Sequence, residues 1–371
     1  MTVKPDWKWI FGLSIDSELA WGAVRVDAAT EGCPYPEPFE AICGKLSDLP
    51  VTLSTNNYHE HIAQCLRTLK EAPDTEFLKK VEAIGVSTIG IADHLNDRLM
   101  SIARRNLIPG QGKYLVNFAQ LFSEIFPDIS RIRIQNDATA KCLYRYEAHL
   151  AHNPKEPVDL LFLAMFSEGV NGGLVRSARS GSMQWGEPVA SLLHQELGHQ
   201  FPPRHPADFA FDPAYSGCPI HLHCFEALAS EVRLRKQWGE DVFQHPEHPA
   251  WDIIAHYVAH FCWNMVLAIP PQKIIILTRN ASVDFQYRVR AIFGQINNGR
   301  SMTGPYVSYP ELERPDFISV LPREMPPYLD GVYGALEMAR LELIDARRTI
   351  FELSDEEKHK RLHQLRNTKR S

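Results

Sequence analysis

The chain has 371 residues, which is enough for two domains or one large bilobal unit at roughly 150 residues per domain. Its 23% charged and 44% hydrophobic residues are ordinary for a globular protein and exclude a largely disordered chain. With 39 Lys and Arg against 45 Asp and Glu, the net charge is −6, which excludes a surface whose overall charge attracts nucleic acid or anionic membrane.

The first part of the chain alternates strand and helix patterns. Two β-rich runs over 9–26, joined at Asp16-Ser17-Glu18, predict a hairpin. Apolar residues at helical spacing then predict helices over 57–71 and 114–126. Apolar runs, the first of them interrupted by glycines, predict strands over 81–92 and 129–135. A turn at Asn136-Asp137 then leads into a predicted helix over 138–149.

The second part contains two apolar runs of strand length. The run over 158–166 predicts a central strand covered on both faces, and a second over 273–277 follows a long helical stretch. This stretch is the most apolar in the chain, but His256, His260 and Asn264 interrupt it, so we predict no transmembrane span and no membrane partner.

The alternation predicts an α/β protein with a sheet in each of two lobes and a cleft between them. We place the N-terminal lobe at 1–135 and the C-terminal lobe at 136–371. The C-terminal lobe ends in a helix that begins with the capping box Ser354-x-x-Glu357 and continues with basic residues. We interpret this tail as a solvated terminal helix, with a nucleic-acid contact as the alternative.

The N-terminal residues and the cysteines indicate the cellular compartment of the protein. The opening residues show no small-residue cleavage site, so we do not interpret them as a secretory signal. Seven cysteines form an odd set without disulfide spacing, which is typical of a reducing environment. We therefore expect a cytoplasmic protein.

One short segment carries a metal-binding pattern. Cys218-Pro-Ile-His221-Leu-His223-Cys224 offers three zinc ligands at C-x-x-H-x-x-C spacing, and His199 is the nearest strong fourth, with His205 or His223 as substitutes. The alternative is a chance concentration of histidines beside small buried cysteines. A closed four-ligand site has no position for water, so we expect structural zinc, which would position Glu226 and Glu196 to bind the hydroxyls of a polyol.

A second pair of candidate residues is Asn136 and Asp137. They follow an apolar strand and precede a helix, where α/β proteins place side chains that contact ligands. Asp137 could act as a general base toward a substrate hydroxyl, with Asn136 orienting the substrate. The alternative is that Asp137 only caps the helix.

Three motifs in this order resemble the ROK family of repressors, open reading frames and sugar kinases. They are Q-N-D-A-T-A at 135–140, E-L-G-H at 196–199, and C-P-x-H-x-x-C-x-E-x-L-A-S at 218–230, which looks most like the bacterial fructokinase branch. The resemblance implies a two-lobed actin-like ATPase (ribonuclease H-like) fold with a central cleft, and a homodimer. It also implies a hexose or amino-sugar ligand held by Asn136, Asp137, Glu196, His199 and Glu226, and zinc held by His199, Cys218, His221 and Cys224.

The nucleotide side departs from the family pattern. The hairpin motif D-x-G-G-T is replaced by Ser14-Ile-Asp-Ser-Glu18, and the loop G-T-G-x-G-G-G by the residues 167–173, with Glu168 in place of a hydroxyl residue. The glycine run after the late strand reads Leu277-Thr-Arg-Asn-Ala-Ser282. Phosphates need close backbone N–H groups, and carboxylates repel them.

Two functions therefore compete. The first is a ROK-type sugar sensor or regulatory protein with an eroded ATP site. The second is a hexose or amino-sugar kinase that uses ATP and Mg²⁺, with Asp137 as general base. The chain starts almost at its first strand, so we expect no helix-turn-helix domain and no direct DNA binding. Spacing alone does not identify the sugar.

Overall fold

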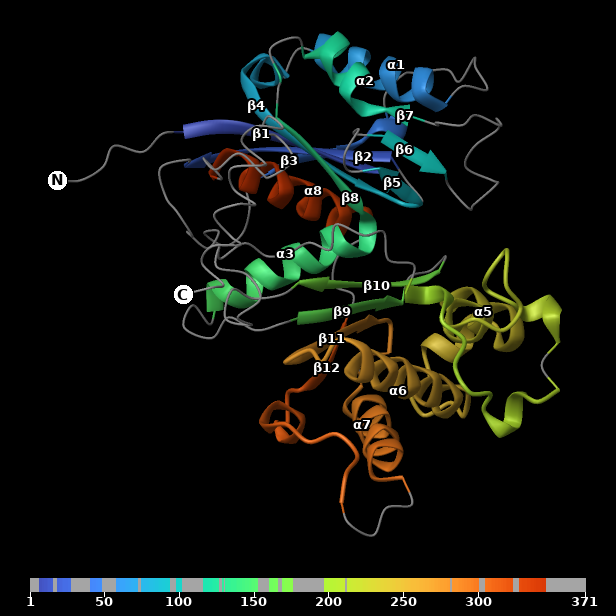
Figure 1. Cartoon of the computed structure of the whole chain (residues 1–371). Helices are drawn as coiled ribbons and strands as arrows, with labels where there is room; N and C mark the ends of the chain where they lie inside the picture. The colour runs from blue at the N-terminus through green and yellow to red at the C-terminus, as the bar shows by residue number, and fades with distance from the viewer. Residues whose placement is uncertain are drawn as a thin grey trace, which may run out of the picture.

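The computed structural model describes residues 7–15, 19–27, 41–48, 58–72, 75–93, 98–101, 116–126, 129, 131–152, 160–165, 169–175, 197–210, 212–280, 282–299, 304–322 and 327–344. These residues form two larger sheets, one above the other, with helices between and around them (Figure 1). Among the described helices, none combines the length and the apolar character needed to cross a membrane.

The first sheet has the strand order β3-β2-β1-β4-β8. Its strands are β1 (Trp7–Ile15), β2 (Leu19–Asp27), β3 (Ile42–Lys45), β4 (Val81–Thr88) and β8 (Ile132–Asn136). β1 pairs with β2 as the predicted hairpin and with β4 in parallel. Helices α1 (Tyr58–Glu71) and α2 (Phe118–Ile125) cover one face, and α8 (Pro327–Ile344) packs on the other. A smaller sheet joins β5 (Ile91–Asp93), β6 (Arg98–Ser101) and β7 (Val116–Asn117).

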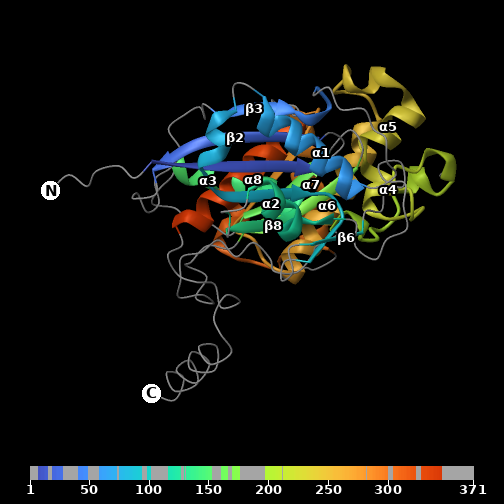
Figure 2. The same cartoon turned by 90° about the horizontal axis from the view of Figure 1, so that it is seen from above.

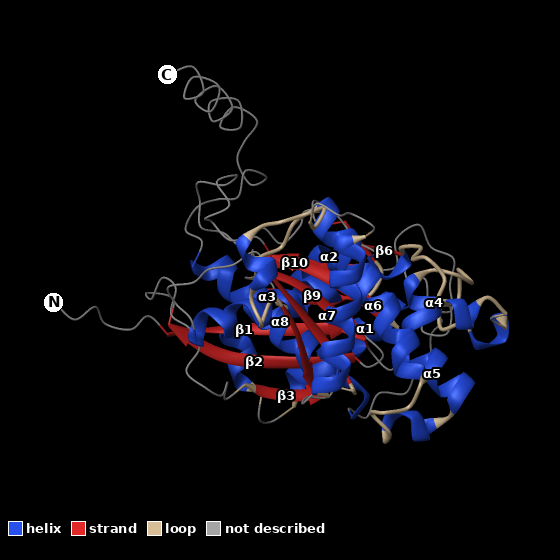
Figure 3. Cartoon of the chain, turned by 90° about the horizontal axis from the view of Figure 1, so that it is seen from below, coloured by secondary structure: helices blue, strands red, loops and turns tan. Residues whose placement is uncertain are grey.

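The second sheet has the order β10-β9-β11-β12. Its strands are β9 (Leu160–Met165), β10 (Val170–Val175), β11 (Lys273–Thr278) and β12 (Ile318–Pro322). Helix α3 (Asp137–His152) covers one face, while α6 (Ala250–Ala268) and α7 (Val283–Asn298) cover the other. Short helices α4 (Phe225–Ala229) and α5 (Glu231–Trp238) lie with their loops at one end of the molecule (Figure 3).

Helices α3 and α8 meet between the two sheets (Figures 1 and 2). Their contact is close because a Cβ on Gly334 would lie 2.5 Å from the carbonyl oxygen of Ala140. Ion pairs cross it as well, with 2.9 Å between Arg145 Nη2 and Asp330 Oδ1. The chain enters α3 directly from β8, so Asn136 and Asp137 lie where the first sheet meets this helix layer.

Two predicted elements differ in detail. The helix expected over 114–126 begins only at Phe118, because Asn117 belongs to β7 and its side chain accepts the N–H of Gln120 as a cap. The turn expected at Asn136-Asp137 is absent, because Asn136 ends β8 and Asp137 begins α3. The predicted helix from Ser354 and the basic tail lie outside the described residues.

Candidate functional site

Four side chains converge where the metal pattern was predicted. His199 ends a short 3-10 turn, Cys218 and His221 lie in one loop, and Cys224 begins α4. One ligand atom from each lies within 4.8 Å of all the others, with 3.3 Å between the two histidine Nδ1 atoms. A tetrahedral ion with metal–nitrogen distances of about 2.0 Å and metal–sulfur distances of about 2.3 Å requires separations of about 3.3 to 3.8 Å.

The two sulfur atoms lie at compatible distances. His199 Nδ1 is 3.7 Å from Cys218 Sγ and 3.6 Å from Cys224 Sγ. The donor set therefore fits a tetrahedral metal ion of borderline softness. The substitutes lie elsewhere: Nδ1 of His205 accepts from Ala207 N, and Nδ1 of His223 lies 2.9 Å from Arg204 Nη1.

The protein prepares a thiolate in this group. Hydrogen bonds, first from the Cys224 thiol and then from His199 and the backbone N–H groups of His221 and Ile220, lower the pKa of Cys218, although burial opposes this shift. The hydrogen bond to Cys218 and burial raise the pKa of Cys224. A thiolate held by backbone donors is the form of cysteine that binds metal.

Buried polar contacts support the metal loop, the segment from Cys218 to Cys224 that carries three of the candidate ligands. Asp208, 2% exposed, accepts from Arg233 at 2.6 Å and from the Tyr257 hydroxyl at 2.6 Å. Lys236 donates to the carbonyl of Ser216 at 2.9 Å. The loop is therefore anchored by the surrounding protein as well as by its four candidate ligands.

Asn136 and Asp137 are both buried at the junction of β8 and α3. The side-chain oxygen of Asn136 accepts from Ala138 N at 3.0 Å and from Asn171 Nδ2 at 3.3 Å. Its Nδ2 atom has no hydrogen-bond partner among the described residues, although Asn136 is only 1% exposed. Asp137 Oδ2 accepts from Lys141 Nζ at 3.0 Å, and this lysine is fully buried.

The start of β10 connects the metal loop to this pair. Val170 N donates to Glu226 Oε2 at 3.1 Å, and Glu226 lies two residues after the candidate ligand Cys224. A Cβ on Gly198, next to His199, would lie 1.9 Å from the Val170 carbonyl oxygen, so glycine is needed for this close approach. Gly198, Glu226 and Asn136 thus all contact the start of β10, the first two at Val170 and the third at Asn171.

The structure locates only part of the predicted sites. It describes every residue proposed to bind sugar or metal except Glu196, which lies outside the described residues. Asp16, Ser17, Glu18, Ser167 and Glu168 lie outside them too. Within the described part, the side chain of Asn136 caps α3, because it accepts the N–H of Ala138.

The segments that correspond to the nucleotide-binding motifs of the ROK family show two further features. Ser14 stands opposite Ser87 in the β1–β4 register, and both hydroxyl oxygens are buried without a partner among the described residues. After β11, Arg279 stacks over Phe243 and lies 3.5 Å from Glu240, so its charge is partly neutralised within the chain.

Sequence reasoning missed two side chains at this site. Lys141 lies one helical turn after Asp137, a spacing that could have identified an ion pair. Asn171 occupies a position that the family pattern gives to glycine, and only the folded chain brings its amide to Asn136.

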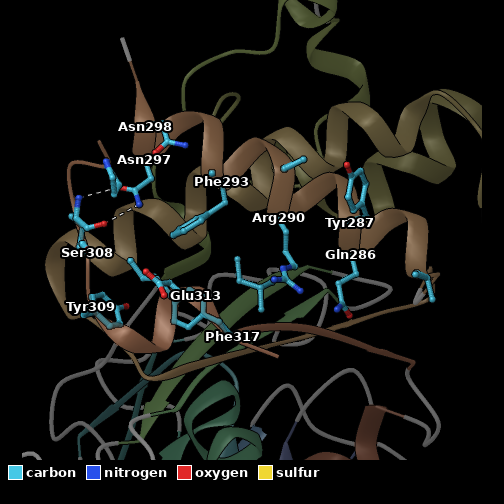
Figure 4. A pocket seen from close by; sticks show the side chains of 17 residues that line it. Gln286, Tyr287, Arg290, Phe293, Asn297, Asn298, Ser308, Tyr309, Glu313 and Phe317 are labelled. Atoms are coloured by element: carbon cyan, nitrogen blue, oxygen red, sulfur yellow. Dashed lines mark hydrogen bonds between the residues drawn. The ribbon is translucent and has the colours of Figure 1, made fainter. Parts of the chain in front are cut away.

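A cavity of about 640 Å³ lies apart from these residues, between α7 and the segment before β12 (Figure 4). Several of its polar side chains bond to the chain's own backbone: Gln286 accepts from Val320 N, Asn297 bonds both backbone groups of Val307, and Arg290 donates to the Pro315 carbonyl. This cavity therefore presents fewer free polar groups than its lining suggests.

Comparison with known proteins supports the fold. No family model matches the chain. A fructokinase from Zymomonas mobilis is 39% identical over 93 residues, which cover 24% of this chain and 30% of that protein. The aligned segment thus spans less than a third of that relative, and the same holds for a putative fructokinase from Bacillus subtilis, of which 31% is covered at 33% identity.

Solved structures match over almost the whole chain. The ROK hexokinase from Thermus thermophilus superposes with a TM-score of 0.55 at 19% identity, covering 91% of this chain and all of that one. The chain has the fold of the ROK sugar kinases. A ROK family transcriptional regulator, a homologue of the Escherichia coli MLC protein, has a TM-score of 0.53 at 13% identity over 91% of this chain and 79% of its own. The predicted two-lobed actin-like ATPase fold is confirmed, and kinases and a regulator share it.

Proposed function

We propose that this ROK-type chain binds a hexose or amino sugar and acts as a sensor or regulatory protein without kinase activity. The observation that carries the proposal is the buried ion pair between Asp137 and Lys141. In the kinase hypothesis Asp137 must take a proton from the sugar hydroxyl. Here one of its oxygens already accepts from a charged donor at 3.0 Å, which weakens it as a base.

The sugar side supports ligand binding. Asn136 presents a buried donor, Nδ2, which a sugar oxygen would satisfy, and an unpaired buried donor costs about 1 to 3 kcal/mol. Glu226 is half-buried, and its carboxylate accepts from Val170 N at 3.1 Å. Donors and carboxylates converging on one place suit the hydroxyls of a sugar.

The nucleotide side supports the absence of phosphoryl transfer. That reaction depends on positioning the phosphates and neutralising their charge. In this chain Ser14 replaces the aspartate of the first phosphate motif. Asn171 replaces a glycine of the second motif, and its side chain contacts Asn136. The first replacement removes a carboxylate, and the second adds a side chain where glycine would let phosphate approach the backbone N–H groups.

We propose that the metal is zinc and that its role is structural. All four positions would be filled by His199, Cys218, His221 and Cys224, which leaves none for a catalytic water. The metal would then hold α4 and Glu226 in place. Metal analysis of protein purified without chelators is expected to find about one zinc per chain, and an absence of zinc would contradict the proposal.

The alternative is an ATP- and Mg²⁺-dependent hexose kinase with Asp137 as base. It is favoured by the named activities of the fructokinase and hexokinase relatives. Thermal unfolding separates the two functions, because a ligand that binds only the folded state raises the midpoint. We expect a rise with one of D-fructose, D-glucose, D-mannose or their N-acetylated amino sugars, and none with ATP and Mg²⁺.

Direct activity assays decide the matter. We expect no sugar phosphorylation above background with ATP, GTP or polyphosphate as donor. Turnover that Asp137→Asn abolishes would establish the kinase.

We also propose a homodimer that does not bind DNA by itself, which sedimentation with and without DNA would test.

A further inference from the structure

The side-chain amide of Asn136 has a defined orientation. Ala138 N is a backbone donor, so the Asn136 atom that it contacts at 3.0 Å must be the oxygen. The same reasoning applies to Asn171, because the backbone N–H of Gly172 donates to its Oδ1 at 2.8 Å. The other end of Asn171, its NH₂ group, therefore faces Asn136.

These two amides form a chain of hydrogen bonds with one open end. Gly172 N donates to Asn171 Oδ1, and Asn171 Nδ2 donates to Asn136 Oδ1 at 3.3 Å. Both donors that reach Asn136 thus bind its oxygen, and within the described part of the chain its Nδ2 has no partner although the residue is buried. The fold therefore presents the Nδ2 donor of Asn136 to a ligand. The Oδ1 atom of the same amide points away from the ligand.

We propose that Asn171 is a positioning residue that fixes the Asn136 amide so that Nδ2 donates to an acceptor oxygen of the bound sugar. The proposal rests on the sugar-binding function and adds a requirement to it. At one sugar position the ligand atom acts as a hydrogen-bond acceptor toward Asn136. Asn171 itself need not touch the sugar.

Asn171→Asp tests this orientation. The aspartate still accepts from Gly172 N, but it offers no donor to Asn136, and its carboxylate favours the reversed amide with the oxygen toward the ligand. We expect sugar affinity to fall roughly tenfold, the equivalent of one hydrogen bond. The matched control is Asn298→Asp, an exposed asparagine at the end of α7, which should bind sugar like the wild type.

A fluorinated ligand gives a readout that general damage to the fold would not produce. Fluorine can only accept a hydrogen bond, so for one monodeoxyfluoro derivative of the hexose that binds, the wild type should retain most of its affinity. The Asn171→Asp variant should lose affinity selectively for that derivative. Equal losses for all derivatives would overturn the inference.

A double-mutant cycle without sugar tests the contact itself. In the wild type, Asn171→Ala should raise the unfolding equilibrium constant several-fold, and in an Asn136→Ala background the same change should have an effect of less than roughly twofold. Additive effects would overturn the inference.

If the wild type binds none of D-fructose, D-glucose and D-mannose, the proposed function fails and the inference with it. If the wild type and Asn171→Asp bind a hexose equally, only the inference fails.

Discussion

Asn136 and Asp137 are neighbours with different chemical situations. Asn136 caps α3 and keeps a donor that no described residue contacts, whereas Asp137 has an oxygen that accepts from Lys141. The lysine is fully buried, and removing a charge from water costs several kcal/mol unless a partner compensates it. Each member of this pair therefore requires the other for stability.

Lys141→Met keeps the volume of the side chain and removes its charge. We expect the free energy of unfolding to fall by about 3 kcal/mol, because a buried carboxylate loses its cation. Chemical denaturation would measure this loss. The double variant Lys141→Met with Asp137→Asn should recover part of it, and a double variant less stable than Lys141→Met would contradict the pairing.

Helix α4 depends on a residue with two roles. Cys224 is a candidate metal ligand, and its sulfur also accepts the N–H of Ala227 as the cap of the helix. Glu226 in the first turn of α4 then reaches Val170 N. The start of α4, a candidate metal ligand and the placement of the carboxylate are thus coupled within three residues.

Substitutions at Cys224 should separate its two roles. We expect Cys224→Ser to lose most of the bound metal while keeping a cap, because serine caps well and is a poor zinc ligand. Cys224→Ala should lose the metal and a further ~1 kcal/mol of stability from the missing cap. Metal content and denaturation midpoints would be measured together. Full metal occupancy in Cys224→Ser would remove this residue from the ligand set.

Glycines show where elements approach most closely. A Cβ on Gly85 in β4 would lie 1.8 Å from the carbonyl oxygen of Ala335 in α8, whereas one on Gly294 in α7 would meet nothing within 4 Å. We expect Gly85→Ala to lower the free energy of unfolding by about 2 kcal/mol or more, because one backbone must move. Gly294→Ala should raise it by roughly 0.5 to 1 kcal/mol through helix propensity. Urea titration of both variants would check this, and equal effects would refute the packing of α8 on β4.

In the described part of the molecule two larger sheets are separated by α3 and α8, and partly buried histidines in α6 affect how its stability depends on pH. His260 in α6 lies with its ring 4.4 Å from that of His256. Burial, and then the charge of His256, lower the pKa of His260 from 6.5 to about 4. Burial also lowers the pKa of His256.

These shifts predict loss of stability in mild acid. Between the two pKa values of His260 the unfolded chain binds more protons, so the free energy of unfolding falls as the pH decreases from about 6.5 toward 4. His260→Gln should reduce the loss by about 1 to 3 kcal/mol relative to the wild type. His245→Gln, at an exposed histidine whose ring lies 3.1 Å from Glu247, is the matched control and should have a much smaller effect than His260→Gln. Parallel pH curves for the wild type and His260→Gln would contradict the shift.

Local pattern alone determined a large part of this protein. The hairpin over 9–26, the helix over 57–71 and the strand over 273–277 were predicted because apolar periodicity reflects burial on one face or both. The candidate metal ligands Cys218, His221 and Cys224 were recognised because they are close in sequence, and the structure brings them together with His199. The family resemblance, confirmed in the fold, supplied the arrangement of the two lobes.

Only the tertiary structure decided how distant segments act on one another. Asn171 reaches Asn136 across 35 positions of sequence, and Glu226 reaches Val170 across 56. Neither contact has a local periodicity, because both depend on how β10 packs beside α3 and α4. The partner of Asp137 was near in sequence, yet its complete burial with Lys141 follows from the packing of α3 against its neighbours. The polar and charged groups of the site were therefore visible in the sequence, but which of them are paired and which stay free depended on the fold.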